Sequence, residues 1–568
     1  MRIVTIESTD LFVRSAHGPL PVVRVHLARD GAPPSGPPRR GAQWRVRVEG
    51  PTVSTPELVC VSTPEPVPGE IPDPDDRTEI VVEVPVSIAA PAPEGSMHRV
   101  TAIVEELSGA TGETTSRSSA DGVIQAAATG WTMWMVSHFH YDPVWWNTQG
   151  GFSQAWYDQP VAEARRPEIC RTAFDLTRAH LEAARDDPDY RFVLAELDYL
   201  KPHWDAAPGD REQMRQLISQ GRLELVGGSY NEPNTNLTHP ESTIRNAVYG
   251  IGYQRDVLGG DPRSAWQLDV FGHDPSYPGL MAQAGLDSTA WARGPFHMVG
   301  PKRHAGDITR MQFPSEFEWI SPSGVGLLTH YMADHYVAGW QFEVQPTLEA
   351  AMADAYREFR ELKQVAATRN VLLPVGHDHN IPSRWCTQIH REWAKRYEWP
   401  RFVVGLPQDF FAAVRAETAA PSLALRPQTR DMNPVFTGKD VSYIDTKQAQ
   451  RAAEVAVLDG ERLATLAWLL GAHYPAEALD KAWRLLLFGA HHDAITGTES
   501  DQVYLDLLGG WREAFELGDA VRAGSLDHLA ACADTTGSGH AVLVTNTLSW
   551  ARDGVVTVQL QLPESSAE

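Results

Sequence analysis

The chain has 568 residues, of which 42% are apolar, enough for a large core. Length alone suggests about three or four domains. The 73 acidic and 49 basic residues give a formal net charge of −24, without any run of basic residues. This charge argues against a nucleic-acid partner, because such partners need a basic face.

Targeting signals and paired cysteines are also missing from the sequence. The amino terminus, "MRIVTIESTDLFVRS", lacks the apolar segment of a secretory signal, and no segment approaches the roughly 20 apolar residues of a membrane span. The four cysteines are too scattered for a disulfide framework or a thiolate zinc site. We therefore expect a cytoplasmic protein with reduced thiols and no membrane partner. The sequence leaves open whether it forms a homo-oligomer.

Residues 1–125 predict a β-rich N-terminal domain. The segments "VVRVHLA", "WRVRVEG", "TEIVVEVPV" and "HRVTAIVEE" are short and rich in valine, and turn-rich stretches separate them. A β-sandwich-like domain is the natural expectation. The polar run from Ser108 to Gly122 is predicted to be a loop or linker that closes this domain.

Residues 130–425 alternate between strand-like and helix-length segments, the first helix being expected around residues 160–185. The seven strand-like segments are "TMWMVSHF", "RFVLAEL", "RLELVGG", "SAWQLDV", "STAWAR", "NVLLPVG" and "RFVVGL". A hairpin-like insert, "SEFEWISPSGVGLLTHYM", follows the fifth. Because helical crossovers join most of these strands, we expect an α/β fold with a parallel sheet, closed or nearly closed into a seven-stranded barrel.

Residues 430–535 predict a small helical bundle, in which "ALDKAWRLLLFGAHHDAIT" reads as one helix. Residues 538–568 then change to β-type sequence. A single hairpin is not independently stable, so this tail is expected to join another sheet or to start a β domain that is truncated here.

Polar residues of the α/β segment gather at the carboxyl ends of its strands, the rim at which parallel α/β folds bind substrates. They are His138, His140, Asp142, Glu196, Asp198, Asn231, Glu232, Asp269, Arg293, His377 and Asp378. The first three alternate along an extended segment, so all three can converge on a divalent ion such as zinc. A polar strand end with satisfied hydrogen bonds is the alternative.

Three further motifs carry candidate chemistry. Asp269 ends an apolar strand, where a carboxylate is costly unless it is paired or metal-bound, whereas a turn explains its neighbours His273 and Asp274. Asp378 follows another apolar strand. Two carboxylates in one cleft suit glycoside hydrolysis, although a turn cap would equally explain Asp378. The "HHD" at residues 491–493, on the expected helix, offers either a further metal ligand or a satisfied buried histidine pair.

Four stretches then point to a known family. The chain contains, in order, "HFHYDPVWW", "WQLDVFGHDPSYPGLMAQAGLD", "LLPVGHDHN" and "FGAHHDAITGTESD". From about Trp131 to Asp501 it resembles glycoside hydrolase family 38, the α-mannosidases. The resemblance implies a seven-stranded α/β barrel of the glycoside hydrolase/deacetylase type and a three-helix bundle. It also implies that the chain is truncated before C-terminal β domains.

The same resemblance implies a zinc-dependent retaining exo-glycosidase acting on terminal α-mannosides, either oligosaccharides or simpler glycosides. Asp269 would be the nucleophile that forms a covalent glycosyl-enzyme, and Asp378 the general acid/base. One zinc ion per chain would be held by His140, Asp142, Asp269 and His492. The sugar would contact Trp145, Arg293 and Tyr336. The ligands would be supported by His138, His491 and Asp493.

Two other functions remain open at this stage. A metal-dependent amidohydrolase or sugar deacetylase would also use an H-x-H metal site, with an aspartate as base for a metal-activated water. A carbohydrate-binding protein with a structural zinc would bind sugar without turnover. Release of an acetyl group with intact glycosidic bonds would identify the first, and sugar binding without hydrolysis the second.

Overall fold

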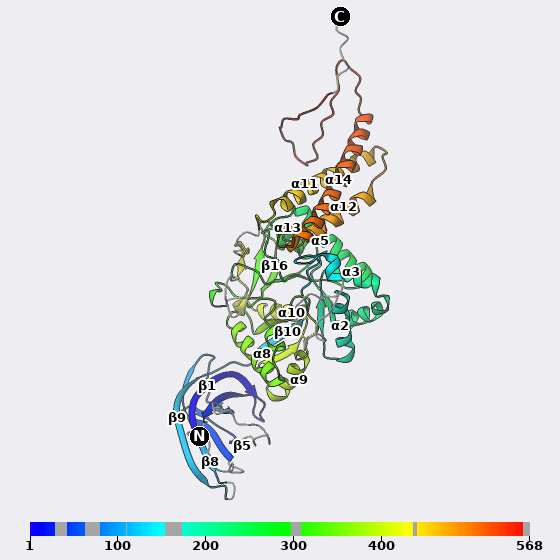
Figure 1. Ribbon diagram of the computed structural model, residues 1–568. Coiled ribbons are helices and arrows are strands. Elements are labelled where there is room, and N and C mark those ends of the chain that lie inside the picture. The colour runs from blue at the N-terminus through cyan, green and yellow to red at the C-terminus, as the bar shows by residue number, and fades with distance from the viewer. Residues whose placement is uncertain are drawn as a thin grey trace.

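The computed structural model describes residues 1–28, 43–62, 80–108, 111–153, 173–296, 308–434 and 440–560. Figure 1 shows three parts in chain order: an N-terminal β domain, a central α/β domain and a helical bundle. The beginning of the helix expected over 160–185 lies outside the described residues. Among the helices that are described, none is both long and apolar enough to cross a membrane.

The N-terminal domain contains two antiparallel sheets with a shared valine-rich core. One sheet is formed by β1 (Arg2–Val13), β2 (Leu20–Ala28) and β6 (Ile80–Pro85). The other is formed by β5 (Val59–Ser62), β3 (Gln43–Glu49), β8 (Met97–Leu107) and β9 (Thr114–Gln125), and a separate pair by β4 (Val53–Ser54) and β7 (Ser87–Ile88). Val25, Val46, Val84 and Val104 lie in the common core, as alternating strands with one buried face predict.

The loop predicted over Ser108–Gly122 is wrong for most of its length. Residues Thr114–Gln125 form β9, which pairs antiparallel with β8. This strand lies at the edge of its sheet and exposes most of its side chains. Hydrogen bonds to β8 hold this strand in place, and the burial of apolar side chains contributes little to its stability. Because its composition is polar, the pattern of apolar residues gives no sign of a strand.

All seven strands predicted for the α/β domain are present, and they pair in parallel. One sheet has the order β12 (Leu223–Leu225), β11 (Phe192–Leu194), β10 (Thr132–Ser137), β17 (Asn370–Val375), with β18 (Arg401–Val404) also beside β10. The other has the order β13 (Ser264–Gln267), β14 (Ser288–Trp291), β16 (Gly326–Tyr331), β15 (Glu316–Ile320), β19 (Pro427–Gln428). The expected hairpin insert is confirmed, since β15 and β16 are antiparallel.

The hydrogen-bond ladders of the described strands thus form two sheets, whereas the sequence predicted one closed or nearly closed sheet. Two backbone hydrogen bonds connect the two sheets. The N–H of Gly227, just after β12, donates to the carbonyl O of Ser264 in β13 (2.8 Å), and the N–H of Gly339, in the loop after β16, donates to the carbonyl O of Pro374 in β17 (2.9 Å). All six residues of β17 are buried, as expected for a strand covered on both faces. The helices of this domain are α1 (Gln149–Ser153), α2 (Ala173–Asp186), α3 (Leu197–Ala206), α4 (Arg211–Ser219), α5 (Pro240–Tyr253), α6 (Tyr277–Gln283), α7 (Trp340–Glu343), α8 (Leu348–Leu362), α9 (Cys386–Arg396) and α10 (Pro407–Thr418).

The helical bundle consists of α11 (Ile444–Leu469), α12 (Ala476–Gly489) and α14 (Asp501–Cys532), with the short α13 (His492–Thr496) before α14. Its core includes Val457, Trp483 and Trp511. The single helix predicted through "ALDKAWRLLLFGAHHDAIT" is wrong, because α12 ends at Gly489. His491 then acts as the N-cap of α13, its Nδ1 accepting the N–H of Asp493 (3.2 Å).

The β-type tail forms no helix or strand within residues 538–560. Its mostly exposed backbone leaves α14, loops back toward the bundle and then turns outward again (Figure 1). At the return, the hydroxyl of Thr547 donates to Oδ1 of Asp459 on α11 (2.7 Å). A lone hairpin buries too little apolar surface to be stable, which explains why strand-like composition does not produce strands here.

The N-terminal domain is anchored to the α/β domain through β1. The N–H of Phe12 donates to the carbonyl O of Trp399 (2.8 Å), and the N–H of Glu398 donates to the carbonyl O of Phe12 (2.7 Å). Leu11 and Val22 lie in the same buried cluster as the α/β residues around Phe402. The two domains therefore share part of one core.

Candidate metal centre and active site

The site begins where β10 and β17 continue side by side past their ends. The N–H of His140 donates to the carbonyl O of His377 (3.2 Å), and the N–H of His379 donates to the carbonyl O of His140 (2.8 Å). This pairing sets Asp378 opposite His140. Gly376 permits the close approach, because a Cβ there would lie 2.1 Å from the carbonyl O of His138.

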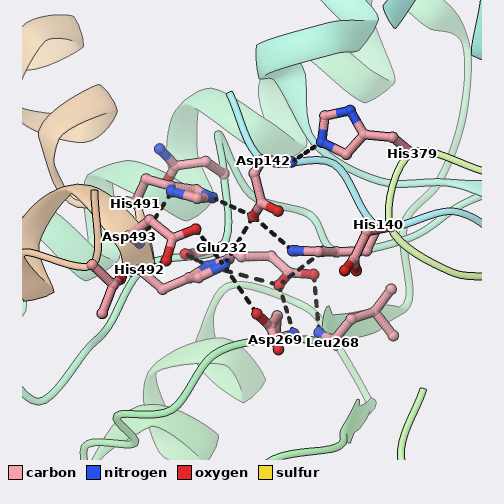
Figure 2. Close-up of polar contacts among 12 residues, drawn as sticks. His140, Asp142, Glu232, Leu268, Asp269, His379, His491, His492 and Asp493 are labelled. Carbon is pink, nitrogen blue, oxygen red and sulfur yellow. Dashed lines mark hydrogen bonds and ion pairs between the residues drawn. The ribbon is translucent and has the colours of Figure 1, made fainter. Parts of the chain in front are cut away.

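The four residues predicted as metal ligands converge on one buried region (Figure 2). Nε2 of His140 lies 2.8 Å from Oδ1 of Asp142, and Nε2 of His492 lies 3.2 Å from the same oxygen. Nε2 of His492 is also 3.8 Å from Oδ2 of Asp269. Two groups of donor atoms, each spanning no more than 4.8 Å, share His492: one is His140, Asp269 and His492, and the other is Asp142, His491, His492 and Asp493.

The donor atoms of this cluster fit a zinc-type ion. Nδ1 of His140 and the Nε2 atoms of His491 and His492 are buried and form no hydrogen bond with any described protein group. Such orphaned nitrogens are costly in an interior unless a ligand engages them. Imidazole nitrogens together with carboxylate oxygens are the mixed donor set typical of catalytic zinc.

The electrostatics of the cluster also favour a cation. Burial opposes protonation of His140, but the carboxylates of Asp142 and Glu232 outweigh it and raise the pKa of His140 well above its usual range. For His492, burial again opposes the charge, while contacts with Asp142 and Asp493 raise its pKa to about 9. A divalent ion would take the place of these protons, so metal binding and proton release are coupled here.

The two predicted catalytic carboxylates have different partners. Asp269 forms an ion pair with Nε of Arg293, whose carbonyl O accepts a hydrogen bond from Nε2 of His273 (2.7 Å). Asp378 Oδ1 accepts the hydroxyl hydrogen of Tyr336 (2.7 Å). Burial raises the pKa of Asp378, although the nearby His140 and His377 oppose this. Tyr336 lies in the loop after β16 (Gly326–Tyr331).

The remaining predicted site residues surround this centre. His138 Nε2 donates to the carbonyl O of Tyr336 (2.9 Å), and burial lowers the pKa of His138 to about 3, so its ring is neutral. Both His491 and His492 approach Asp142, at 3.6 Å and 3.2 Å. Asp493 accepts the hydroxyl hydrogen of Thr498 (2.5 Å). Trp145 is 38% exposed in the segment that follows the ligands.

Glu232 follows a strand end in the sequence but has no role among the predicted site residues. Its buried carboxylate accepts the backbone N–H groups of Leu268 (2.9 Å) and Asp269 (3.0 Å), as Figure 2 shows. Its carbonyl O accepts Nδ1–H of His492 (2.9 Å). His379, also unassigned, accepts the N–H of Asp142 at Nε2 (3.1 Å). No residue spacing reveals such side-chain-to-backbone contacts between distant strands, although an acidic residue after an apolar strand was a usable signal.

Comparison with known proteins decides the family. Residues 130–439, more than half of the chain, match the model of the "Glycosyl hydrolases family 38 N-terminal domain". The chain belongs to glycosyl hydrolase family 38. Residues 435–529 match the "Alpha mannosidase middle domain", which corresponds to the helical bundle of this family 38 chain.

Individual relatives are distant. Mouse Alpha-mannosidase 2x is 24% identical over an alignment 440 residues long, which covers 66% of this chain and 36% of that protein. Human Alpha-mannosidase 2C1 is 22% identical over 381 residues, 66% of this chain and 34% of that protein. The crystal structure of an alpha-mannosidase from Enterococcus faecalis V583 matches with a TM-score of 0.59 and 21% identity, over 71% of this chain and 43% of that one, so the fold is shared. The family 38 chain thus spans roughly a third of the length of these two mammalian relatives.

Proposed function

We propose that this family 38 chain carries the active site of a zinc-dependent retaining exo-glycosidase that removes terminal α-mannosides. The observation that carries the proposal is the position of Asp269, whose carboxylate faces both the histidine cluster and Arg293. Asp378 follows β17 and lies opposite His140. The names of the relatives, which are α-mannosidases, support the choice of sugar. We also infer that the two sheets of the α/β domain are two arcs of one seven-stranded barrel, with a β-sandwich before it and a three-helix bundle after it.

His140, Asp142, Asp269 and His492 would hold the zinc ion. When bound, zinc would attract sugar hydroxyls and stabilise negative charge near the reacting carbon. Arg293 forms an ion pair with the carboxylate of Asp269, the proposed nucleophile. Asp378 has a raised pKa, which favours the protonated form that a general acid needs. The exposed indole of Trp145 offers an apolar surface to the C–H face of a sugar.

Hydrolysis would follow two displacements. In the first, an oxygen of Asp269 bonds to the anomeric carbon while the bond to the leaving oxygen breaks, and Asp378 donates its proton to that oxygen. In the second, Asp378 takes a proton from water, whose oxygen attacks the anomeric carbon and releases Asp269. Two inversions give net retention, for which the two carboxyl groups should lie about 5–5.5 Å apart.

The stereochemistry of the first product tests this proposal. The full-length protein would be mixed with an aryl α-mannoside, and the released sugar followed by NMR before its anomers equilibrate. We expect α-mannose to form first. Initial β-mannose would exclude the mechanism, and acetate release from an N-acetylated sugar with its glycosidic bond intact would favour the deacetylase alternative.

Tyr336→Phe should shift the pH profile of the reaction. The Tyr336 hydroxyl donates to Asp378 and thereby favours the charged carboxylate, so its removal should raise the pKa of Asp378 further. Hydrogen bonds to charged groups contribute about 1.5–3 kcal/mol, which corresponds to about one to two pH units. Since the acid must be protonated, the alkaline limb of kcat/KM should move to higher pH.

Tyr443→Phe is the matched control, because the Tyr443 hydroxyl also donates to an aspartate, Asp501, at 2.8 Å but on the surface of the bundle. Its profile should equal that of the unmodified protein. If the alkaline limb of the Tyr336→Phe variant does not move, Tyr336 does not influence the pKa of the general acid.

Glu232→Gln should weaken zinc binding without unfolding the domain. The amide has one acceptor oxygen in place of two, so one N–H of the Leu268–Asp269 backbone loses its partner. Residues that hydrogen-bond to metal ligands typically raise the affinity for the metal by about 10–100-fold. We expect zinc affinity, measured by competition with a chelator, to fall by about that factor. Glu224→Gln is the control, since Glu224 is also buried but accepts a hydrogen bond from the Gln408 N–H. Equal zinc affinity in both variants would contradict this role.

A further inference from the structure

The two carboxyl oxygens of Asp378 have different surroundings. Oδ1 accepts the hydroxyl hydrogen of Tyr336 (2.7 Å), whereas Oδ2 lies 3.7 Å from Nδ1 of His377. Because Oδ1 already accepts a donated hydrogen, Oδ2 is the oxygen left to carry the proton of a general acid. The oxygen of the leaving group must therefore come close to Oδ2, on the side of the carboxyl group where His377 lies.

The imidazole of His377 offers a hydrogen-bond donor beside this oxygen. Its Nδ1 accepts the backbone N–H of Asp378 (2.7 Å), so the ring hydrogen is on Nε2. Nε2 has no hydrogen-bond partner among the residues that the structure describes, and the side chain is 39% exposed. The carbonyl O of His377 accepts the N–H of His140 (3.2 Å), which fixes the backbone that carries the ring.

An aromatic side chain lies next to this imidazole. Trp340, the first residue of α7, is half-buried, and its ring centroid is 5.5 Å from that of His377, with 59° between the ring planes. The side chain of Asp378 is 27% exposed, so solvent and substrate can reach it. An N–H donor beside an apolar ring matches the two kinds of surface that a sugar presents, its hydroxyl oxygens and its C–H groups.

We propose that His377 and Trp340 bind the leaving group of the substrate, and that this leaving group is a second sugar. Nε2–H of His377 donates to a hydroxyl oxygen of that sugar, and the indole of Trp340 packs against its C–H groups. The proposal rests on the proposed glycosidase function, since it needs Asp378 as the acid. It narrows the substrate class from α-mannosides in general to oligosaccharides that end in an α-mannosyl group.

His377→Asn separates binding of the leaving sugar from support of Asp378. Oδ1 of asparagine can take the place of Nδ1 and accept the N–H of Asp378, whereas no group replaces Nε2–H. We would measure kcat/KM for an α-linked mannobiose and for methyl α-mannoside, two substrates whose leaving oxygen needs the same protonation. We expect a loss of about three- to ten-fold with mannobiose and of less than about two-fold with methyl α-mannoside, which has no second sugar.

A second variant and a control complete the test. Trp340→Leu should show the same difference between the two substrates. His473→Asn, which changes an exposed histidine between α11 and α12, should leave both values of kcat/KM unchanged.

Two results would overturn the assignment of His377. Equal losses with both substrates in His377→Asn would show that the residue acts through Asp378 alone, and an unchanged kcat/KM for mannobiose would show that it does not bind the leaving sugar. If the unmodified protein cleaves neither substrate, the glycosidase function fails together with this proposal. That result is distinguishable, because it is seen before any variant is made.

Discussion

Replacing Asp269 by asparagine is expected to abolish mannoside hydrolysis, with a loss in kcat of about 10⁴-fold or more. An amide cannot form the glycosyl ester, and the ion pair with Arg293 is lost as well. Because asparagine has nearly the same shape, the fold should persist. A fluorinated mannosyl inhibitor that traps glycosyl esters should label the unmodified protein on the peptide containing Asp269, as mass spectrometry would show.

Asp274→Asn is the matched control for this variant. Asp274 lies on the same turn, and its Oδ1 accepts the N–H of Ser276 (2.6 Å), a contact that an amide oxygen can also make. It should keep near-normal turnover. If Asp269→Asn retains a tenth of the activity, or if the label is found on another carboxylate, Asp269 is not the nucleophile.

His492→Ala is expected to remove zinc from the protein and activity with it. His492 is the residue shared by both donor groups, and its Nε2 approaches both Asp142 and Asp269. The loss of zinc affinity should exceed the roughly 10–100-fold typical of a supporting residue such as Glu232. Metal analysis by mass spectrometry, alongside turnover of an aryl α-mannoside, would measure both effects.

The control is His528→Ala, which changes a half-buried histidine on α14 of the same bundle and should keep one zinc ion per chain. Chelation of the unmodified protein should reproduce the His492→Ala result, and added Zn²⁺ should reverse it. Full activity in the chelated protein would show that the cluster is not a catalytic metal centre.

The strands of the α/β domain could be predicted because each is an apolar run bounded by turns, and most of them are followed by a helix. β9 could not, since its stability comes from hydrogen bonds to β8 at an exposed edge. The break between α12 and α13 was also missed. The composition around His491 is helical, and only the cap formed by its own side chain shows where one helix ends and the next begins.

The predicted ligands lie together because strand ends in a parallel fold meet at one rim, a geometry that follows from the connectivity. The role of Glu232 could not be predicted, because it acts through the backbone of Leu268 and Asp269, 36 and 37 residues further along the chain. Family resemblance contributed His492, whose sequence context alone was more typical of a satisfied buried histidine pair.

The docking of β1 on the α/β domain has a consequence for how the protein can be divided. A shortened chain that begins at residue 130 would lack Leu11 and Val22, so the α/β residues that pack against them would be exposed to water. The backbone near Trp399 would also lose its hydrogen bonds with Phe12. This shortened chain should aggregate or unfold at a lower temperature, even though it keeps all of the predicted metal ligands. We therefore expect the N-terminal domain to be part of the smallest unit of this protein that folds independently, and engineered versions of the protein should keep it attached.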